Sequence, residues 1–506
     1  MANRSKVKSF AELADLLEEL RAGPARKVVY CHGVFDLLHI GHIRYLQQAR
    51  ALGDVLVMTI TKDEFVNKGP HRPAFSDQLR LAALAALDCV DYLAINEWPT
   101  ATEALRQLKP SIYAKGAEFR ERKTPELLME EQAAAEVGTT VEFIEGITSS
   151  SSHLINKYLS PLDDEADRHL EQFRERHQPA DVLGWLDRAK DLKVLVVGET
   201  IIDEYYMCSA IGQSAKAPIL ATRYESHERF AGGAAAVANH LAPFCDDVDL
   251  VSMLGAQNTE EEWVRSHLRE QVTPRFHYKQ NSPTIIKRRY REAYFGVPLF
   301  AINFLNDEPQ FHDEDVQLCS MLEESLDEYD LVIVADYGHQ MLTERARQLL
   351  CEKAPFLAVN TQSNAANAGF HLISKYSRAD FVSLAERELQ LECRVRGEDL
   401  ERQLPDVGQR LYATTITVTL GKRGCLSYNR RAGFHETPSL ATSIVDRVGA
   451  GDAFHAVASL CAAVDAPLDV LGFLGNVAGA EAVATVGNSQ SIEALPFRRH
   501  VESLFK

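Results

Sequence analysis

Apolar and polar positions alternate along the chain in two recurring patterns. Residues 54–60 (DVLVMTI) and 90–95 (VDYLAI) are short apolar runs with the length and composition of buried strands. Residues 39–52 and 76–87 place apolar side chains at helical spacing, and Ser76 is a candidate N-cap. Because such strands and helices take turns, the pattern predicts an α/β protein with parallel sheets covered by helices.

This alternation occurs in two separate stretches. The first ends near residue 159, and the second resumes with the apolar run at 193–203 (KVLVVGETIID). Residues 160–190 between them are dense in charge, which predicts a helical, solvated linker. We therefore expect a first domain at 1–159, a linker at 160–190 and a larger domain at 191–506. A length of 506 residues suits two large α/β domains.

Composition and charge indicate which classes of molecule this protein binds. A content of 46% hydrophobic and 25% charged residues is typical of soluble globular proteins. The net charge of -18 argues against nucleic acids and membranes, whereas small phosphorylated substrates need only a local positive pocket. The nine cysteines form no C-x-x-C pair, and we find no signal peptide or membrane span. These features predict a reduced, cytoplasmic protein.

The first candidate site lies in the sequence GVFDLLHIGHIRYL, residues 33–46. A predicted strand runs into this glycine loop, and a helix begins near His42, with His39 and Gly41 just before it. A helix N-terminus offers free N–H groups and about half a unit of positive charge to a phosphate. Two imidazoles aimed at phosphate oxygens suit the charge that builds during nucleotidyl transfer. Chance spacing and a zinc pair are the alternatives, but the local sequence offers no third zinc ligand.

Residues 27–159 resemble the cytidylyltransferase-like nucleotidyltransferases, a Rossmann-like fold. The resemblance rests on GVFDLLHIGH, RP at 72–73, KG at 115–116 and the serine-rich GITSSSSHLI. It looks closest to the adenylyltransferase half of the bifunctional heptose-phosphate enzymes, with glycerol-3-phosphate cytidylyltransferase a near second. The resemblance implies that His39 and His42 are catalytic and that ATP or CTP binds. The serine run has a flexible linker as its alternative. The nucleotide-binding residues that the resemblance implies are Gly33, Phe35, Asp36, Gly41, Lys68, Lys115, Thr148, Ser149, Ser150 and Ser151.

The second candidate site lies in DRVGAGDAF, residues 446–454. Gly449, Ala450 and Gly451 precede an apolar helix, so their consecutive N–H groups can form an anion hole. Asp452 sits in the first helical turn, where it can accept a proton from a substrate hydroxyl while the amides hold the transferring phosphate. The alternative is an ordinary glycine loop with an aspartate cap.

Residues 191–490 resemble the ribokinase-like carbohydrate kinases. The resemblance rests on VGETIIDEYY, FAGGAAAVANHLA, TLGKRGCL and DRVGAGDAF. Residues 214–242 are again similar to the kinase half of the heptose-phosphate enzymes. The resemblance implies ATP with Mg²⁺ and Asp452 as the base. The basic run 287–289 either holds a substrate phosphate or forms a charged strand edge. The remaining expected roles are nucleotide binding by Gly421, Gly449, Ala450 and Gly451, substrate binding by Asp203, Gly232, Gly233, Asn239, Lys287 and Arg288, and metal binding by Glu388.

Several positions depart from the family pattern. Ala236 stands where these kinases usually have asparagine, and Ala385 opens their N-x-x-E metal pattern. Arg447 replaces a usual threonine, and GHQ follows Tyr337 where the heptose members carry a lysine. The domain order is also reversed, because the heptose enzymes place the kinase first. These departures leave the identity of the sugar open.

The two sites together predict a bifunctional transferase of nucleotide-sugar synthesis. The C-terminal domain is expected to phosphorylate a sugar or sugar phosphate with ATP. The N-terminal domain is expected to join a sugar or polyol phosphate to ATP or CTP and release pyrophosphate. The alternative is a CDP-polyol-type cytidylyltransferase joined to a degenerate kinase domain that binds sugar or organises a dimer. In either case we expect a homodimer or higher oligomer.

Overall fold

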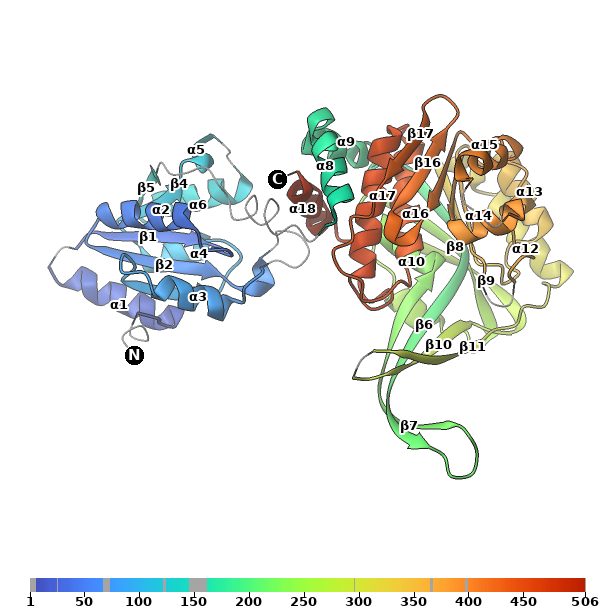
Figure 1. Cartoon of the computed structure of the whole chain (residues 1–506), viewed down its shortest axis with the longest axis horizontal. Helices are drawn as coiled ribbons and strands as arrows, with labels where there is room; N and C mark the ends of the chain where they lie inside the picture. Colours follow the sequence, from blue (N-terminus) through green and yellow to red (C-terminus); the bar gives the residue numbers. More distant parts are fainter. Residues whose placement is uncertain are drawn as a thin grey trace. The chain divides into compact units, whose positions relative to one another are not determined.

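The computed structural model describes residues 6–24, 26–66, 73–121, 124–144, 162–294, 296–364, 367–395 and 399–505. The chain forms two compact units, Met1–Pro161 and Leu162–Phe505 (Figure 1). Both alternate strands and helices, which confirms the predicted α/β class. Within the described ranges, no helix is long and apolar enough to cross a membrane.

The first unit is built on a sheet of five parallel strands in the order β3-β2-β1-β4-β5. All seven residues of β2 are buried, because helices cover both faces of the sheet. One apolar cluster joins the sheet to α2 and α3, and a second joins it to α1, α4 and α6. The elements are α1 (Phe10–Ala22), β1 (Val28–Gly33), α2 (Ile40–Ala51), β2 (Val55–Thr61), η2 (Asp63–Phe65), α3 (Asp77–Ala85), β3 (Tyr92–Asn96), α4 (Thr102–Leu108), β4 (Ile112–Gly116), α5 (Glu118–Glu121), α6 (Pro125–Glu136) and β5 (Thr140–Ile144).

The strand order of the first unit places its first candidate site. The order reverses between β1 and β4, which pair in parallel with Cys31 opposite Ala114. Their carboxyl ends, Gly33 and Gly116, therefore open at one edge of the sheet. Ligands of open parallel sheets bind outside this edge, where the strand order reverses. The loop that carries the two histidines follows β1 and so lies at that edge.

The second unit is built on a larger sheet in which the long strand β6 is shared. The first half of β6 pairs in parallel with β8 and β12, and the sheet continues from β12 through β13, β14, β15, β16 and β17. The last two strands run antiparallel to their neighbours. The strands are β6 (Lys193–Gln213), β7 (Leu220–Gly233), β8 (Asp247–Gln257), β9 (Val272–Pro283), β10 (Ile285–Glu292), β11 (Pro298–Phe304), β12 (Leu331–Asp336), β13 (Leu357–Thr361), β14 (Phe381–Ala385), β15 (Thr415–Thr419), β16 (Cys425–Asn429) and β17 (Gly433–Thr437).

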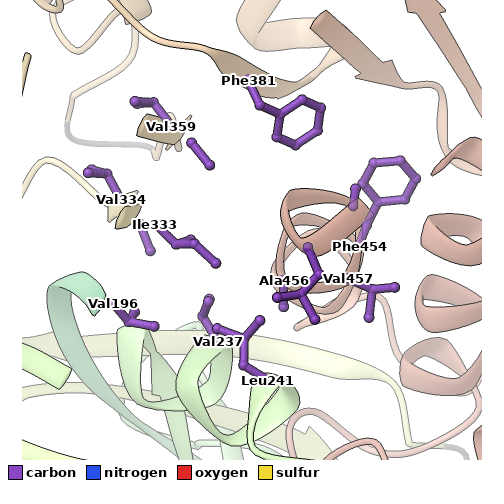
Figure 2. Packing of buried hydrophobic residues seen from close by; sticks show 14 of the residues in the cluster. Val196, Val237, Leu241, Ile333, Val334, Val359, Phe381, Phe454, Ala456 and Val457 are labelled. Atoms are coloured by element: carbon purple, nitrogen blue, oxygen red, sulfur yellow. The ribbon is translucent and has the colours of Figure 1, made fainter. Parts of the chain in front are cut away.

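One apolar core holds this sheet to its helices. Figure 2 shows Val196 of β6 and Val334 of β12 on the side of the core that the sheet supplies, with Val237 of α10 and Val457 of α16 on the helix side. The core is continuous because both helices carry apolar residues on nearly every face. The helices are α8 (Asp164–Arg176), α9 (Pro179–Arg188), α10 (Ala234–Leu241), α11 (Glu261–Ser266), α12 (His312–Glu323), α13 (Glu344–Lys353), α14 (Glu386–Cys393), α15 (Leu400–Arg410), α16 (Ala450–Ala463), α17 (Leu468–Val483) and α18 (Ala494–Leu504), with single turns η3 (Leu326–Glu328), η4 (Ile373–Lys375) and η5 (Gly421–Arg423).

A four-stranded side sheet, β7-β6-β10-β11, extends from the body of the second unit (Figure 1). The second half of β6 leaves the main sheet and pairs with β7 and β10. Half of the residues of β7 are exposed, and the exposed stretch 223–228 is mostly polar, so no apolar pattern in the sequence indicated this strand. The side sheet is the main element that sequence periodicity missed.

Residues 162–190 belong to the second unit and are not a solvated linker. They form the helices α8 and α9, and each buries one apolar face despite its high charge. Phe173 of α8 is fully buried and stacks on Phe473 of α17, with ring centroids 4.5 Å apart. Arg176 reaches Asp469 at 2.8 Å. The charged residues masked this face in the sequence, because they cover the solvent side of the same helices.

Candidate active sites

The two histidines of the first unit lie together at the start of α2. His39 is the N-cap, and its Nδ1 accepts a hydrogen bond from the Gly41 backbone N–H at 3.1 Å. The ring centroids of His39 and His42 are 4.0 Å apart. Phe35, in a left-handed conformation with φ +50°, packs its ring edge-on against His42 at 5.2 Å. The predicted pair of imidazoles at a helix N-terminus is therefore present.

The protonation of His39 follows from these contacts. Burial lowers the pKa of His39, so the ring is neutral near pH 7. Since Nδ1 accepts a hydrogen bond, the ring proton must sit on Nε2. His39 Nε2 is buried and has no hydrogen-bond partner among the described residues. A buried N–H without a partner is costly, so this atom is available to a ligand that accepts a hydrogen bond.

Arg80 of α3 ties the loops around this site together, a role that the sequence did not reveal. Its side chain is fully buried. The guanidinium donates to the carbonyls of Val34 (2.6 Å), Thr61 (2.8 Å) and Phe75 (2.9 Å), and it also pairs with Asp63 at 2.6 Å. Val34 follows β1, Thr61 ends β2 and Phe75 lies shortly before α3, so Arg80 joins the segments that follow two neighbouring strands. The one available signal was an arginine inside an apolar helical pattern.

Lys115, expected near the nucleotide phosphates, is bound within the fold. Its Nζ lies 2.7 Å from Glu130, and both side chains are nearly buried. Tyr113 donates to the same carboxylate at 2.9 Å. Lys115 would have to leave this ion pair to bind a phosphate, so the geometry opposes the expected role.

Of the other expected residues of the first site, two lie in the described part of the chain and five do not. Gly33 ends β1, and a side chain there would meet the Phe35 ring at 3.0 Å. Asp36 is buried and accepts a hydrogen bond from the Phe75 backbone N–H at 3.2 Å. Lys68, Thr148, Ser149, Ser150 and Ser151 lie outside the described residues.

The glycine turn of the second unit opens α16 as expected. Gly449 is the N-cap and has φ +87°, and a Cβ there would lie 2.1 Å from Asn488 Oδ1, so only glycine fits. A cavity of about 230 Å³ lies beside this turn. Three predicted nucleotide-binding residues, Gly421, Ala450 and Gly451, line the cavity together with Arg447. The site therefore offers a pocket next to free helical N–H groups.

Asp452 is buried in the first turn of α16, where its carboxylate is held by two side chains. Tyr337 donates its hydroxyl to Asp452 Oδ1 at 2.9 Å, and Gln362 donates its amide to the same oxygen at 2.8 Å. Burial, reinforced by the charge of Asp203, raises the pKa of Asp452 to about 7. A carboxylate with a pKa near neutrality suits a general base.

Asp203 lies opposite a basic strand. The parallel pairing of β6 with β10 sets Lys287 beside Asp203, and Arg289 reaches Asp203 Oδ1 at 2.5 Å. Gly232 is required here, because a Cβ would lie 2.3 Å from Asp203 Oδ2. Gly233 has φ +63°, which favours glycine. The expected Asp203 and double-glycine cluster is thus assembled, with Arg289 as an addition.

The basic run of β10 is split between two faces of the side sheet. Successive strand residues point to opposite faces, so Lys287 and Arg289 share one face and Arg288 takes the other. The Lys287 ammonium lies 5.9 Å from the Tyr337 ring, and burial lowers its pKa. Arg288 instead pairs with Glu204 at 2.6 Å and lies over the Tyr206 ring. Arg288 is therefore not part of the Asp203 cluster, contrary to expectation.

Two further expected residues have structural contacts instead of ligand-facing ones. Asn239 donates to the His267 carbonyl at 2.8 Å and accepts from the Arg269 N–H at 3.0 Å, so both ends of its amide bind the protein itself. Glu388 accepts from the Ala385 and Ser363 N–H groups at 2.7 and 3.0 Å. In the described part of the chain, no group of three or more carboxylate, histidine or cysteine ligands could hold a metal ion. The sequence did not predict these contacts, because the partners are backbone atoms and most of them are distant along the chain.

Comparison with known proteins agrees with the two predicted domains. Residues 191–495 match the pfkB family of carbohydrate kinases, and residues 30–157 match the cytidylyltransferase-like family. In the N-terminal part, the protein named "Bifunctional protein HldE" from Pelobacter propionicus is 40% identical over 158 residues. This match covers 31% of this chain and 31% of the relative. The protein of the same name from Syntrophotalea carbinolica is 39% identical over 159 residues, again 31% of each chain. The chain thus matches about a third of the length of these relatives.

Solved structures support the fold of the second unit. Phosphofructokinase-2 from Escherichia coli, in complex with potassium, aligns with a TM-score of 0.51 at 16% identity. The alignment covers 62% of this chain and 100% of that one. The same enzyme in complex with substrates and products aligns with a TM-score of 0.50 at 16% identity and the same coverage. The chain belongs to the pfkB family of carbohydrate kinases, and a cytidylyltransferase-like domain precedes its kinase domain.

Proposed function

We propose that the second unit phosphorylates a hydroxyl of a sugar with ATP. The observation that carries this proposal is Asp452, a buried carboxylate with a pKa of about 7 beside the N–H groups of Gly449, Ala450 and Gly451. Asp452 takes the proton of the sugar hydroxyl as the oxygen attacks the terminal phosphorus of ATP, and ADP leaves. The amides hold the transferring phosphoryl group, whose negative charge they match.

Magnesium fits this site only as a partner of the nucleotide. The Glu388 carboxylate is used by two backbone amides, and the described residues gather no set of three ligands. Mg²⁺ commonly keeps its waters and binds nucleotide phosphates with one or two protein carboxylates. We therefore assign no protein ligand to it.

The sugar is proposed to carry an anionic group, most simply a phosphate, and to react at its anomeric hydroxyl. Lys287 and Arg289 support this, since both face the Asp203 cluster in a chain of net charge -18. Arginine binds a phosphate through two parallel hydrogen bonds. Phosphorylation at the anomeric position would produce a sugar 1-phosphate, which a nucleotidyltransferase can use.

The first unit is proposed to transfer a nucleotidyl group from ATP or CTP to a sugar or polyol phosphate. An oxygen of the acceptor phosphate attacks the α-phosphorus, and pyrophosphate leaves. His39 supports this role, because its buried Nε2–H has no partner among the described residues and His39 lies at a helix N-terminus. The two units would then act on one pathway, and the name of the relatives, "Bifunctional protein HldE", is consistent with that pairing.

We propose that the side sheet pairs with the side sheet of a second copy of the chain. Several of its large apolar side chains are exposed: Phe300 by 53%, Ile302 by 43% and Tyr224 by 54%. Exposed apolar groups gathered on one sheet commonly mark a protein interface. Phe300→Asp should yield a monomer in analytical ultracentrifugation, whereas a wild-type chain that is itself monomeric would overturn this part. All nine cysteines are free thiols, which supports a cytoplasmic location.

One assay with three variants tests the proposed activities. Heptose phosphates and other sugar phosphates are screened with ATP and CTP, and ADP and pyrophosphate are measured separately. Asp452→Asn should lose sugar-dependent ADP formation by about 10²–10⁴-fold and keep pyrophosphate release. His39→Ala and His42→Ala should each lose pyrophosphate release by about 10²–10³-fold and keep ADP formation. If Asp452→Asn forms ADP at the wild-type rate, Asp452 is only a helix cap.

A further inference from the structure

The two hydrogen bonds of Asp452 converge on one of its oxygens. Oδ1 accepts from Tyr337 and from Gln362, whereas Oδ2 has no hydrogen-bond partner among the described residues. A carboxylate held in this way cannot rotate freely, because rotation would break both hydrogen bonds. Oδ2 is consequently the oxygen left for the substrate.

Tyr337 is itself held in place by the turn that follows β12. The carboxylate of Glu199, fully buried in β6, accepts hydrogen bonds from three backbone N–H groups of this turn. These are the N–H groups of Tyr337 and His339, both at 2.9 Å, and of Met341 at 3.4 Å. Three donors on one carboxylate fix the turn more firmly than backbone contacts alone would. Tyr337 is only 3% exposed, so its ring is packed in the interior of the unit.

We propose that Tyr337 is a positioning residue that holds Asp452 with Oδ2 toward the sugar hydroxyl, and that Glu199 fixes the turn from which Tyr337 acts. Gln362 is the second hydrogen-bond donor that holds Oδ1 of Asp452. This inference rests on the proposed kinase function. It adds a residue that acts through Asp452 and decides which oxygen of the base is available.

The hydrogen bond has a second, measurable consequence for the base. A donor to the charged carboxylate favours the charged form, so Tyr337 opposes the rise in the pKa of Asp452 that burial causes. The other charged groups that act on Asp452 are Asp203, which raises the pKa, and Lys287, which lowers it. Removing the Tyr337 hydroxyl should therefore raise the pKa of Asp452 further. The acidic limb of a pH–rate profile should move to higher pH with it.

The test compares Tyr337→Phe with a matched control in the full chain. Tyr329→Phe is the control, because Tyr329 is also buried and also donates to an aspartate of the second unit, Asp249. Aspartate carboxyl carbons are labelled with ¹³C and titrated by NMR, and the Asp452 signal is assigned by its loss in Asp452→Asn. Tyr337→Phe should raise the midpoint of this signal by about half a pH unit or more, and Tyr329→Phe should leave it unchanged.

A kinetic arm uses heptose 7-phosphate with MgATP as the probe. Tyr337→Phe should lower kcat about tenfold with little change in the KM for ATP, as expected for one lost hydrogen bond to a charged group. Gln362→Leu should move the midpoint of the Asp452 titration in the same direction. This variant replaces Tyr337→Phe in the test if Tyr337→Phe does not fold. Unchanged midpoints in both variants would overturn the positioning role. Wild-type ADP formation by Asp452→Asn would instead overturn the proposed function, while the titration would still report on Tyr337.

Discussion

Arg289 and Asp203 form an ion pair at 2.5 Å, with the Asp203 side chain only 5% exposed. The pair joins β10 to β6 beside the Gly232–Gly233 turn. An aspartate expected to face the sugar is thus already neutralised by a cation from the neighbouring strand. We expect an anionic substrate to use both partners, with its hydroxyls on Asp203 and its charged group on the guanidinium and Lys287.

We therefore expect Arg289→Ala to raise the KM for the sugar phosphate by roughly ten- to a hundredfold, the loss expected for hydrogen bonds to a charged group. Arg288→Ala is the matched control, since Arg288 lies on the opposite face and pairs with Glu204. The measurement is initial ADP formation at saturating ATP. Equal effects of the two variants would show that the strand faces do not separate substrate contact from structure.

Arg80→Met should abolish pyrophosphate release and leave ADP formation intact. The change removes the donors of three backbone carbonyls and of Asp63, and each buried acceptor left without a partner costs about 1–3 kcal/mol. Arg106→Met in the same unit is the control, because its ion pairs with Glu103 and Glu136 are exposed. Pyrophosphate release and thermal unfolding should be followed together. Full activity in Arg80→Met would mean that the loops hold their shape without it.

Phe173→Ala should destabilise the second unit by about 3–5 kcal/mol, the usual cost of removing a buried phenylalanine. Glu171→Ala, at an exposed position of the same helix, should change the stability by no more than about 0.5 kcal/mol. Urea unfolding monitored by loss of ADP formation separates the second unit from the first. A silent Phe173→Ala would restore the interpretation of α8 as a solvated linker.

The stability of the second unit should fall as the pH is lowered from about 6.5 to about 4. Burial lowers the pKa of His240 and of His455 to about 4, whereas both titrate near 6.5 when unfolded. Between these values the unfolded state binds more protons than the folded one, so acid favours unfolding. Each histidine should contribute a slope of up to about 1.4 kcal/mol per pH unit. Urea midpoints at pH 7, 6 and 5 measure the slope.

His240→Gln should reduce this slope, and His312→Gln should not, because His312 is exposed. A stability that is constant from pH 7 to pH 5 would contradict the burial of neutral imidazoles at these two positions.

Local sequence patterns determined much of this protein. The strands of the first unit appear where apolar runs predicted them, and α2 and α16 begin at the predicted histidine and glycine turns. Ser76 precedes α3 as predicted, although its side chain makes no capping hydrogen bond. These features could be read directly because burial, helix starts and left-handed glycines depend mainly on neighbouring residues.

Tertiary structure alone decided the contacts that join distant residues. Tyr337 and Gln362 both meet Asp452 although they lie 115 and 90 positions before it, and no local pattern encodes their convergence. The charged surfaces of α8 and of the side sheet concealed elements that pack or pair on their other face. The faces of Arg288 and Arg289 were set by the register of β10 on β6, and one step of register exchanges every side chain between the faces of a sheet. The sequence by itself therefore determined the two folds and the turns at which α2 and α16 begin, and only the tertiary structure decided which side chains gather around each turn.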